Sequence, residues 1–450
     1  MHFLTYNPST SALLTDFYQL TMLEAYLDAD MHAEAVFEFY VRRLPPNRNF
    51  LVACGLSSIL TFLEQFHFSA QEIAYLEGTG IFSAKLLKYL GDCSFTGDVF
   101  AMPEGTIFFA NEPVIRVIAP IALAQLVETR LITFAHFETL VCSKAARCML
   151  AAAGKSFLVD FGLRRAHGEE AGLLAARSSY VAGFAGTSNV LAGAMFGMPL
   201  FGTMAHSYIE AFADEELAFL AFARANPSNV TFLIDTYDTL RGALNAVKAA
   251  EKLSREGIRV NAVRLDSGDI LKLSKEVRQI LDEHGFPNIK IFASGDLDEY
   301  ALDKLNRAEA PINGFGIGTK LNTSADGPYL ECAYKLMEYD GRPTLKKSPD
   351  KSTLPGRKQV FRCFRNDVMT SDTIALERDN CTGTPLLQKV MEKGRRVGNE
   401  PDLTAIAAHT KKELESLPAD LRRIEAVEPY HVEIAPGLLQ LREDVEASLP

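Results

Sequence analysis

Short apolar runs alternate with helix-type patterns over residues 158–319, and most of these runs end in glycine or polar residues. Strands that alternate with helices are typical of a parallel sheet with crossover helices. The pattern therefore predicts a parallel β/α barrel of irregular form, with an open doubly wound sheet as the alternative. The runs that we interpret as strands are Leu158–Phe161, Val181–Gly186, Leu200–Met204, Val230–Asp235, Val260–Asp266, Ile289–Ser294 and Gly314–Thr319.

The residues on either side of this repeat have a different pattern. Residues 13–27 have helical spacing, residues 35–41 alternate as a strand, and residues 123–153 predict one long helix. We therefore expect an α/β protein in which the barrel is joined by a second, α+β domain. The predicted domains are residues 1–135 as the N-terminal part of the α+β domain, 136–340 as the barrel with the catalytic site, and 341–450 as a C-terminal segment that returns to the α+β domain.

A basic segment with several Pro and Gly residues covers residues 348–358 and carries Lys351, Arg357 and Lys358. Such a segment is most often a solvated turn. The alternative is a lid that closes over a phosphate-rich ligand.

Composition narrows the class of protein. The chain has 450 residues, of which 48% are apolar and 23% charged, so it can bury a large core. The net charge of −11 argues against a sequence-independent grip on nucleic acid. Seven cysteines without a C-x-x-C pair are typical of reduced thiols in a cytoplasmic protein. We expect neither a signal peptide nor a membrane span.

Polar residues follow each of the predicted strands. In β/α folds the binding groups lie at the carboxyl ends of the strands, so these residues are expected to share one site. In chain order they are Arg164 and His167, Thr187 and Ser188, His206, Asp235 and Tyr237, Arg264 with Asp266 and Asp269, Ser294 and Asp296, and Gly318–Lys320.

Two carboxylates flank a tight Ser-Gly turn after the fifth predicted strand. One of Asp266 and Asp269 can accept hydrogen bonds from sugar hydroxyls while the other reaches Mg²⁺ or a histidine. Asp269 has the alternative role of capping the next helix, whereas Asp266 lies on the strand end. His206 follows a Gly-Thr strand end that opens onto a helix, which is a favourable place for anions.

The Gly-rich end at residues 316–320 is a candidate phosphate site, because the last strands of a barrel commonly hold phosphate. The sequence contains no P-loop, no Cys/His metal cluster and no G-x-S-x-G motif. Any ATP is therefore expected to bind without a P-loop. Mg²⁺ is expected to arrive with phosphates rather than to be held by the protein alone.

Taken together, six motifs resemble the nicotinate phosphoribosyltransferase family, and the resemblance spans nearly the whole chain in order. They are Thr15–Met22, Phe161–Arg165, Gly186–Asn189, Gly202–Ser207, Arg264–Asp269 and Gly316–Thr319. The resemblance implies conversion of nicotinate and phosphoribosyl pyrophosphate to nicotinate mononucleotide and pyrophosphate in NAD salvage. It also implies coupling to ATP hydrolysis, which formally makes the enzyme a carbon–nitrogen ligase, Mg²⁺ bound with phosphoribosyl pyrophosphate and ATP, and a homodimer with shared active sites.

The resemblance also assigns roles to single residues. His206, Asp266 and Arg264 are expected to be catalytic, with His206 matching the histidine that ATP phosphorylates. An imidazole nitrogen is a competent nucleophile near neutral pH, which suits that role.

The other assigned residues are expected to bind substrate. Tyr18 of the other subunit and Phe161 would stack on the pyridine ring, and Arg164 would hold the nicotinate carboxylate. The remaining predicted substrate-binding residues are Thr187, Ser188, Asp269, Ser294, Gly295, Asp296, Gly318 and Thr319.

Three alternatives remain. A related nicotinamide-specific enzyme carries Asp where this chain has Ser188, and a serine can donate a hydrogen bond to a carboxylate that an Asp would repel. A barrel that binds phosphorylated ligands without turnover is a second alternative. A barrel lyase would need a lysine at a strand end, for which Lys320 is the candidate, but its neighbours suit phosphate better.

Overall fold

The computed structural model describes residues 10–347 and 353–449. The chain divides into two compact units, one made of Met1–Ser143 with Gly327–Pro450 and the other of Lys144–Asp326. The second unit is therefore shorter at both ends than the predicted barrel, which runs from residue 136 to residue 340. One reason is that β12 (Cys332–Tyr339), which falls in the predicted barrel, pairs along its length with β1 (Glu34–Val41) of the first unit.

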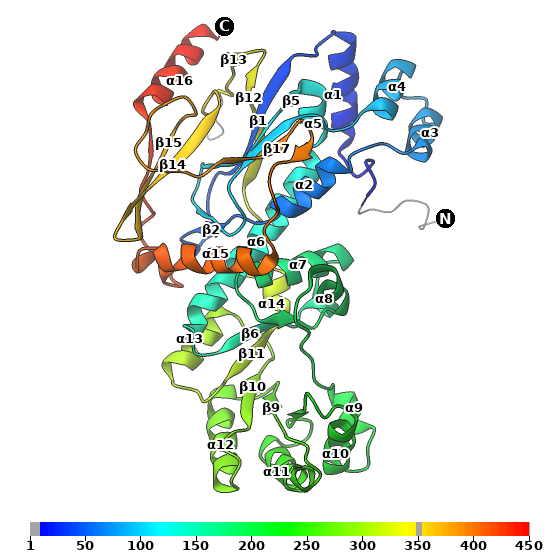
Figure 1. Ribbon diagram of the computed structural model, residues 1–450, viewed down its shortest axis with the longest axis vertical. Helices are drawn as coiled ribbons and strands as arrows, with labels where there is room; N and C mark the ends of the chain where they lie inside the picture. The colour runs from blue at the N-terminus through cyan, green and yellow to red at the C-terminus, as the bar shows by residue number, and fades with distance from the viewer. Residues whose placement is uncertain (1–9, 348–352, 450) are drawn as a thin grey trace. The chain divides into compact units, whose positions relative to one another are not determined.

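A seven-stranded sheet forms the core of the first unit (Figure 1). Its central strands pair antiparallel, and every residue of β1 after Glu34 is buried, as expected for a strand covered on both faces. The strand predicted at residues 35–41 is thereby confirmed. In order across the sheet the strands are β13 (Arg342–Pro343), β12, β1, β5 (Pro113–Pro120), β3 (Asp98–Ala101), β17 (Gln388–Glu392) and β18 (Arg395–Arg396).

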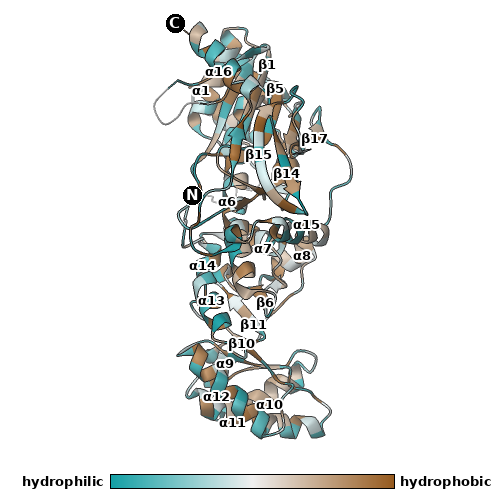
Figure 2. Ribbon diagram, turned by 90° about the vertical axis from the view of Figure 1, so that its left-hand side faces the viewer, coloured by the Kyte–Doolittle hydropathy of each residue, from teal (hydrophilic) through white to brown (hydrophobic). Residues whose placement is uncertain are grey.

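Two smaller sheets and a set of helices complete this unit. Brown, hydrophobic stretches are visible on β5, β14 and β15 in Figure 2, which agrees with their buried positions. The smaller sheets are β16 (Thr384–Pro385), β14 (Lys358–Arg365), β15 (Val368–Leu376) and β19 (Val432–Ile434), and β2 (Leu51–Val52) with β4 (Ile107–Phe108). The helices are α1 (Phe17–Asp28), α2 (Leu56–Glu64), α3 (Ala70–Gly78), α4 (Ala84–Asp92), α5 (Ile121–Leu126), α15 (Leu403–Ser416) and α16 (Pro436–Ser448).

The helix predicted from residue 123 to 153 is interrupted near its start. The structure has α5, then Val127, then α6 (Glu128–Ala152), which runs on into the second unit. Among the described residues, no helix is long and apolar enough to cross a membrane. The seven cysteines are free thiols.

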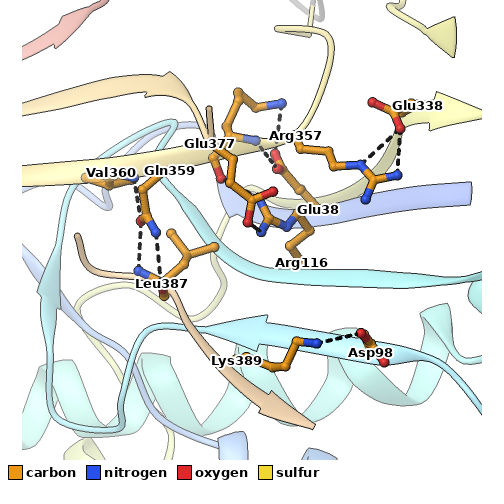
Figure 3. A network of polar contacts seen from close by, with 11 residues as sticks. Glu38, Asp98, Arg116, Glu338, Arg357, Gln359, Val360, Glu377, Leu387 and Lys389 are labelled. Atoms are coloured by element: carbon orange, nitrogen blue, oxygen red, sulfur yellow. Dashed lines mark hydrogen bonds and ion pairs between the residues drawn. The ribbon is translucent and has the colours of Figure 1, made fainter. Parts of the chain in front are cut away.

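Ion pairs fix the end of the basic segment to the first unit (Figure 3). The guanidinium of Arg357 binds Glu338 and Glu34, each at 2.8 Å. The buried ammonium of Lys358 lies 2.8 Å from Glu38 and donates to two backbone carbonyls. Arg357 and Lys358 therefore have structural partners, while Lys351 lies outside the described residues.

A six-stranded parallel sheet forms the second unit. Its order is β7 (Gly186–Thr187), β6 (Phe157–Asp160), β11 (Gly314–Ile317), β10 (Lys290–Ala293), β9 (Ala262–Leu265) and β8 (Thr231–Leu233). The helices of this unit are α7 (Glu169–Val181), α8 (Val190–Phe196), α9 (His206–Glu210), α10 (Glu215–Ala225), α11 (Thr239–Arg255), α12 (Ile270–Glu283), α13 (Glu299–Arg307) and α14 (Thr319–Asn322). This arrangement confirms the α/β class and a barrel-like parallel core.

Two of the seven predicted strands are almost absent from the sheet. Val181 ends α7, and only Gly186 and Thr187 pair with β6. Leu200 forms a single parallel bridge to Thr187, after which the chain leaves the sheet. The segment after this bridge lines the candidate site, as described below, instead of continuing the ladder.

Helices α11 and α12 cover the sheet with one apolar face each, and both carry hydrophilic and hydrophobic stretches in Figure 2. Asp238, Asp269 and Asp298 cap α11, α12 and α13 by accepting hydrogen bonds from backbone N–H groups. Each cap lies shortly after a strand, so the carboxyl ends of the strands and the starts of these helices lie along one edge.

His136 of the first unit gives a stability prediction. Its Nε2 accepts a hydrogen bond from the Leu330 N–H at 2.9 Å, and burial lowers the pKa of this imidazole. The unfolded chain therefore binds the proton more readily, and stability is lost as the pH falls below about 6.5. We expect a lower melting temperature at pH 5.5 than at pH 7.5, and a smaller difference in His136→Gln, measured by circular dichroism. The exposed His67→Gln should keep the wild-type difference; equal differences in all three proteins would contradict the prediction.

Candidate functional site

A cavity of about 380 Å³ opens at the carboxyl ends of the strands in the second unit. Residues that follow β6, β7, β9, β10 and β11 meet there, as expected for a β/α fold. The predicted site residues that line it are Phe161, Arg164, Ser188, Arg264, Asp266, Ser294, Gly295, Asp296, Gly318 and Thr319.

Asp266 lies at the centre of a hydrogen-bond network in this cavity. Its Oδ1 accepts hydrogen bonds from the hydroxyl of Ser294 and from Nη2 of Arg264, the latter at 2.9 Å. The Arg264 Nε donates to the same Ser294 hydroxyl at 2.8 Å, which closes a three-residue ring. The Arg264 guanidinium also lies 5.4 Å from the centre of the Phe161 ring. Arg264 thus contacts both Asp266, on what we call the acidic side of the cavity, and Phe161, on its aromatic side.

The network keeps Asp266 ionised. Burial acts to raise its pKa, but the hydrogen bonds from Ser294 and Arg264, together with the charges of Arg264 and His206, outweigh burial. The pKa of Asp266 therefore lies below its ordinary value. A fixed negative charge in a partly buried cavity is suited to stabilising a developing cation.

His206 is the first residue of α9 and contacts the network from the side. Its Nδ1 lies 3.1 Å from the hydroxyl of Thr236, and its Nε2 lies 3.7 Å from Oδ2 of Asp266. The side chain is 38% exposed, so a ligand can reach the ring. One ring nitrogen is thus held by a hydroxyl while the other faces a carboxylate.

Asp235 holds the turn that carries Asp266. Its Oδ2 accepts hydrogen bonds from the Asp266 N–H at 3.0 Å and from the Ser267 hydroxyl at 2.6 Å. Its Oδ1 is buried and has no hydrogen-bond partner within the described part of the chain. Carboxylate oxygens are the ligands that Mg²⁺ prefers, so Asp235 offers a donor atom of the right kind.

The turn after β10 makes a close approach to Asp266. Gly295 has φ +90°, and a Cβ there would lie 2.0 Å from the carbonyl oxygen of Asp266. Asp296 follows with φ +47°. The Lys320 Nζ donates to the Asp296 carbonyl at 3.0 Å and lies 3.1 Å from Oδ2 of Asp298, so it joins this turn to the start of α14.

The other predicted residues have different surroundings. The Thr187 hydroxyl is buried and points to Asp160, so it does not line the cavity. Asp269 is exposed and caps α12 through Oδ1, which was the alternative role weighed from the sequence. Tyr18 belongs to the first unit, where burial and the charges of Glu128 and Asp16 raise its pKa to about 12. The roles of all three residues stay predictions.

Sequence reasoning assigned no role to several lining residues. Thr203 belongs to the network, since its hydroxyl oxygen accepts a hydrogen bond from Nη1 of Arg264 at 3.1 Å. Its position near the end of the predicted strand Leu200–Met204 was the available signal in the sequence. The other unassigned lining residues are Leu163, Arg165, Gly202, Met204, Ala205 and Leu297, whereas Gly316 and Lys320 belong to the predicted phosphate site at residues 316–320.

One group of three side chains in the described ranges brings possible metal ligands within 4.8 Å of one another, namely Cys54, Glu104 and Glu138 of the first unit. Glu104 already accepts a hydrogen bond from the Gly55 N–H, and Cys54 is fully buried with its thiol pKa raised by burial. A neutral thiol is a poor metal ligand. The carboxylates of the second unit therefore suit Mg²⁺ better.

Comparison with known proteins gives one consistent result. The nicotinate phosphoribosyltransferase family model matches residues 157–354, and the models of its N-terminal and C-terminal domains match residues 13–135 and 357–442. A nicotinate phosphoribosyltransferase of Mycobacterium tuberculosis is 47% identical over 415 residues, which cover 92% of this chain and 89% of that protein. That of Bacillus subtilis is 37% identical, with coverage of 94% and 93%.

Solved structures agree with the sequence comparisons. The crystal structure of human nicotinic acid phosphoribosyltransferase matches with a TM-score of 0.87 and 28% identity, over 97% of this chain and all of that chain. A nicotinate-nucleotide pyrophosphorylase from Pyrococcus furiosus matches with a TM-score of 0.75 and 26% identity, over 92% and 98% of the two chains.

Proposed function

Because this chain belongs to the nicotinate phosphoribosyltransferase family, we propose that it transfers the phosphoribosyl group of phosphoribosyl pyrophosphate to nicotinate, with ATP hydrolysis coupled through His206. The products are nicotinate mononucleotide, which serves NAD salvage, and the leaving group pyrophosphate. The observation that carries the proposal is that one cavity combines an aromatic side chain with an arginine and a serine on one side and a partly buried carboxylate with Gly-rich turns on the other.

The aromatic side is suited to nicotinate. Phe161 offers a ring face, and Arg164 offers a guanidinium that can bind the nicotinate carboxylate through two parallel hydrogen bonds. Ser188 can donate a further hydrogen bond, which is favourable for an acid and unnecessary for an amide.

The acidic side is suited to the sugar and its phosphates. Asp266 would accept hydrogen bonds from the ribose hydroxyls, and Ser294–Asp296 with Gly318 and Thr319 would bind the phosphate end through backbone N–H groups. The nicotinate nitrogen donates its electron pair to the anomeric carbon while the bond to pyrophosphate breaks, and the leaving oxygen takes that bond's electrons. The charge of Asp266 stabilises the positive charge that the sugar gains as the bond to pyrophosphate breaks.

His206 supplies the nucleophile for ATP coupling. Its Nε2 makes no hydrogen bond within the described residues, whereas Nδ1 is held by Thr236. An attack by a ring nitrogen on the γ-phosphorus forms an N–P bond and breaks the P–O bond to ADP. Water later attacks the same phosphorus and breaks the N–P bond, which releases phosphate and restores the imidazole. Mg²⁺ would neutralise phosphate charge during binding, and Asp235 has the free carboxylate oxygen that fits it.

Exposed apolar side chains support a homodimer with shared sites. Phe17 and Tyr18 on α1 are 58% and 46% exposed, and Val190 and Met195 on α8 are 69% and 58% exposed. Apolar surfaces of this kind favour burial against another chain. Tyr18 is then proposed to stack on the pyridine ring bound by a second copy.

We expect purified protein with Mg²⁺ to form mononucleotide from nicotinate and phosphoribosyl pyrophosphate, to prefer nicotinate over nicotinamide, and to be stimulated by ATP. His206→Ala should lose the stimulation, because it removes the nucleophile, and ADP formation should fall to background. Mononucleotide and ADP are followed together by chromatography. The exposed His284→Ala, at the end of α12, is the control and should keep the stimulation.

Each alternative gives a different outcome in this assay. Equal or preferred use of nicotinamide would favour the nicotinamide enzyme. Absence of product from either base would leave a phosphate-ligand binding protein as the better account. ATP stimulation that survives in His206→Ala would contradict the phosphohistidine.

A further inference from the structure

Asp160 is a buried carboxylate that the mechanism above does not use. It is the last residue of β6, directly before Phe161, and its exposed fraction is 0%. Its Oδ1 accepts hydrogen bonds from the Gly162 N–H at 2.9 Å and from the Asn322 side-chain amide at 2.8 Å. Its Oδ2 accepts one from the Thr187 hydroxyl at 2.7 Å.

These three donors come from three separate segments, each of which continues into residues that line the cavity or directly follows them. Gly162 belongs to the loop with Phe161 and Arg164, Thr187 directly precedes Ser188, and Asn322 ends the short helix that begins at Thr319. A single side chain therefore connects the ends of β6, β7 and β11.

The Thr187 hydroxyl extends this connection by one step. While it donates to Asp160, its oxygen accepts a hydrogen bond from the Asn189 N–H at 3.0 Å. Asn189 in turn caps α8, since its side chain accepts from the Ala192 N–H at 3.1 Å. Ser188 thus lies between Thr187, which binds Asp160 directly, and Asn189, which is linked to Asp160 through the Thr187 hydroxyl.

The packing leaves this arrangement little freedom. A Cβ at Gly162 would lie 2.0 Å from the Asn322 amide nitrogen, so only glycine lets the loop after β6 approach α14 so closely. Buried polar groups without partners are costly, and the donors around Asp160 would lose theirs if the carboxylate were removed.

From this geometry we infer that Asp160 is a positioning residue for the base-binding side of the cavity, acting on Phe161 and Arg164 through Gly162 and on Ser188 through Thr187. The inference rests on the proposed function, in which these three residues bind nicotinate. It assigns Thr187 an indirect role instead of a contact with substrate.

Two variants test the inference. Asp160→Asn keeps the shape of the side chain but removes the charge and one acceptor oxygen, and Thr187→Val removes only the hydroxyl. In both variants we expect the KM for nicotinate to rise about tenfold or more, with a smaller change in the KM for phosphoribosyl pyrophosphate. Thr187→Ser restores the hydroxyl and should return the KM toward the wild-type value. Thr231→Val, a buried threonine at the opposite end of the same sheet, is the matched control.

A second measurement does not depend on turnover. Hydrogen exchange followed by mass spectrometry on the unliganded full chain should show faster exchange at residues 161–165 and 187–190 in Asp160→Asn and Thr187→Val, but not in Thr231→Val. Unchanged exchange in these segments, or equal rises of both KM values, would overturn the inference. Turnover of the wild-type protein, measured in the same assay, tests the proposed function separately.

Discussion

Asp266→Asn is expected to lower kcat/KM for phosphoribosyl pyrophosphate about 100-fold or more, since a lost charged hydrogen bond and a lost stabilising charge at the reacting centre each cost about 1.5–3 kcal/mol. The carboxylate binds Ser294 and Arg264 and faces His206 at 3.7 Å. The amide would leave the guanidinium of Arg264 without its counter-charge. It would also present a neutral group to the cationic sugar.

Steady-state kinetics with nicotinate at saturation measures this effect. Asp303→Asn is a matched control, because Asp303 on α13 also pairs with an arginine, Arg307, at 2.7 Å, but outside the cavity and with a guanidinium that is 69% exposed. Exposed pairs of this kind contribute little, so the control should retain activity within about twofold. A loss of less than threefold in Asp266→Asn, in a variant with a wild-type melting curve, would rule out the role given to this carboxylate.

The carboxyl-end site could be predicted because its signal is local. Each strand of the repeat ends in polar or glycine residues, and parallel strands bring those ends together whatever their order in the sheet. Ser188, Arg264, Ser294 and Gly318 line the cavity for this reason. The order of the strands and the early departure of the chain after Leu200 depend on long-range packing, which has no local signal.

Roles that depend on burial could not be read from the sequence. Asp160 lies inside a predicted apolar run, and nothing local shows that its carboxylate meets Thr187 and Asn322. Likewise, Arg357 and Lys358 read as part of a solvated turn or a lid. The structure gives them the acidic partners Glu34 and Glu38, which lie more than 300 residues away in the sequence.

Ser188→Asp is expected to turn base preference away from nicotinate. Ser188 and Arg164 line the same cavity, so the new carboxylate would face the carboxylate of bound nicotinate and compete for the same guanidinium. Two like charges about 4 Å apart repel by about 4 kcal/mol at the effective dielectric constant of a protein surface. Allowing for the open cavity and for relaxation, kcat/KM for nicotinate should fall about 100-fold.

Nicotinamide has no charge to be repelled, and its amide can donate to the new carboxylate, so its kcat/KM should stay level or rise. The decisive quantity is therefore the ratio of the two kcat/KM values, measured by mononucleotide formation from each base. Ser188→Asn is the matched control, because it has the size of Asp without the charge. If Ser188→Asp and Ser188→Asn change the ratio of the two kcat/KM values by the same factor, the loss comes from the size of the new side chain. Ser188 then does not select the acid by charge.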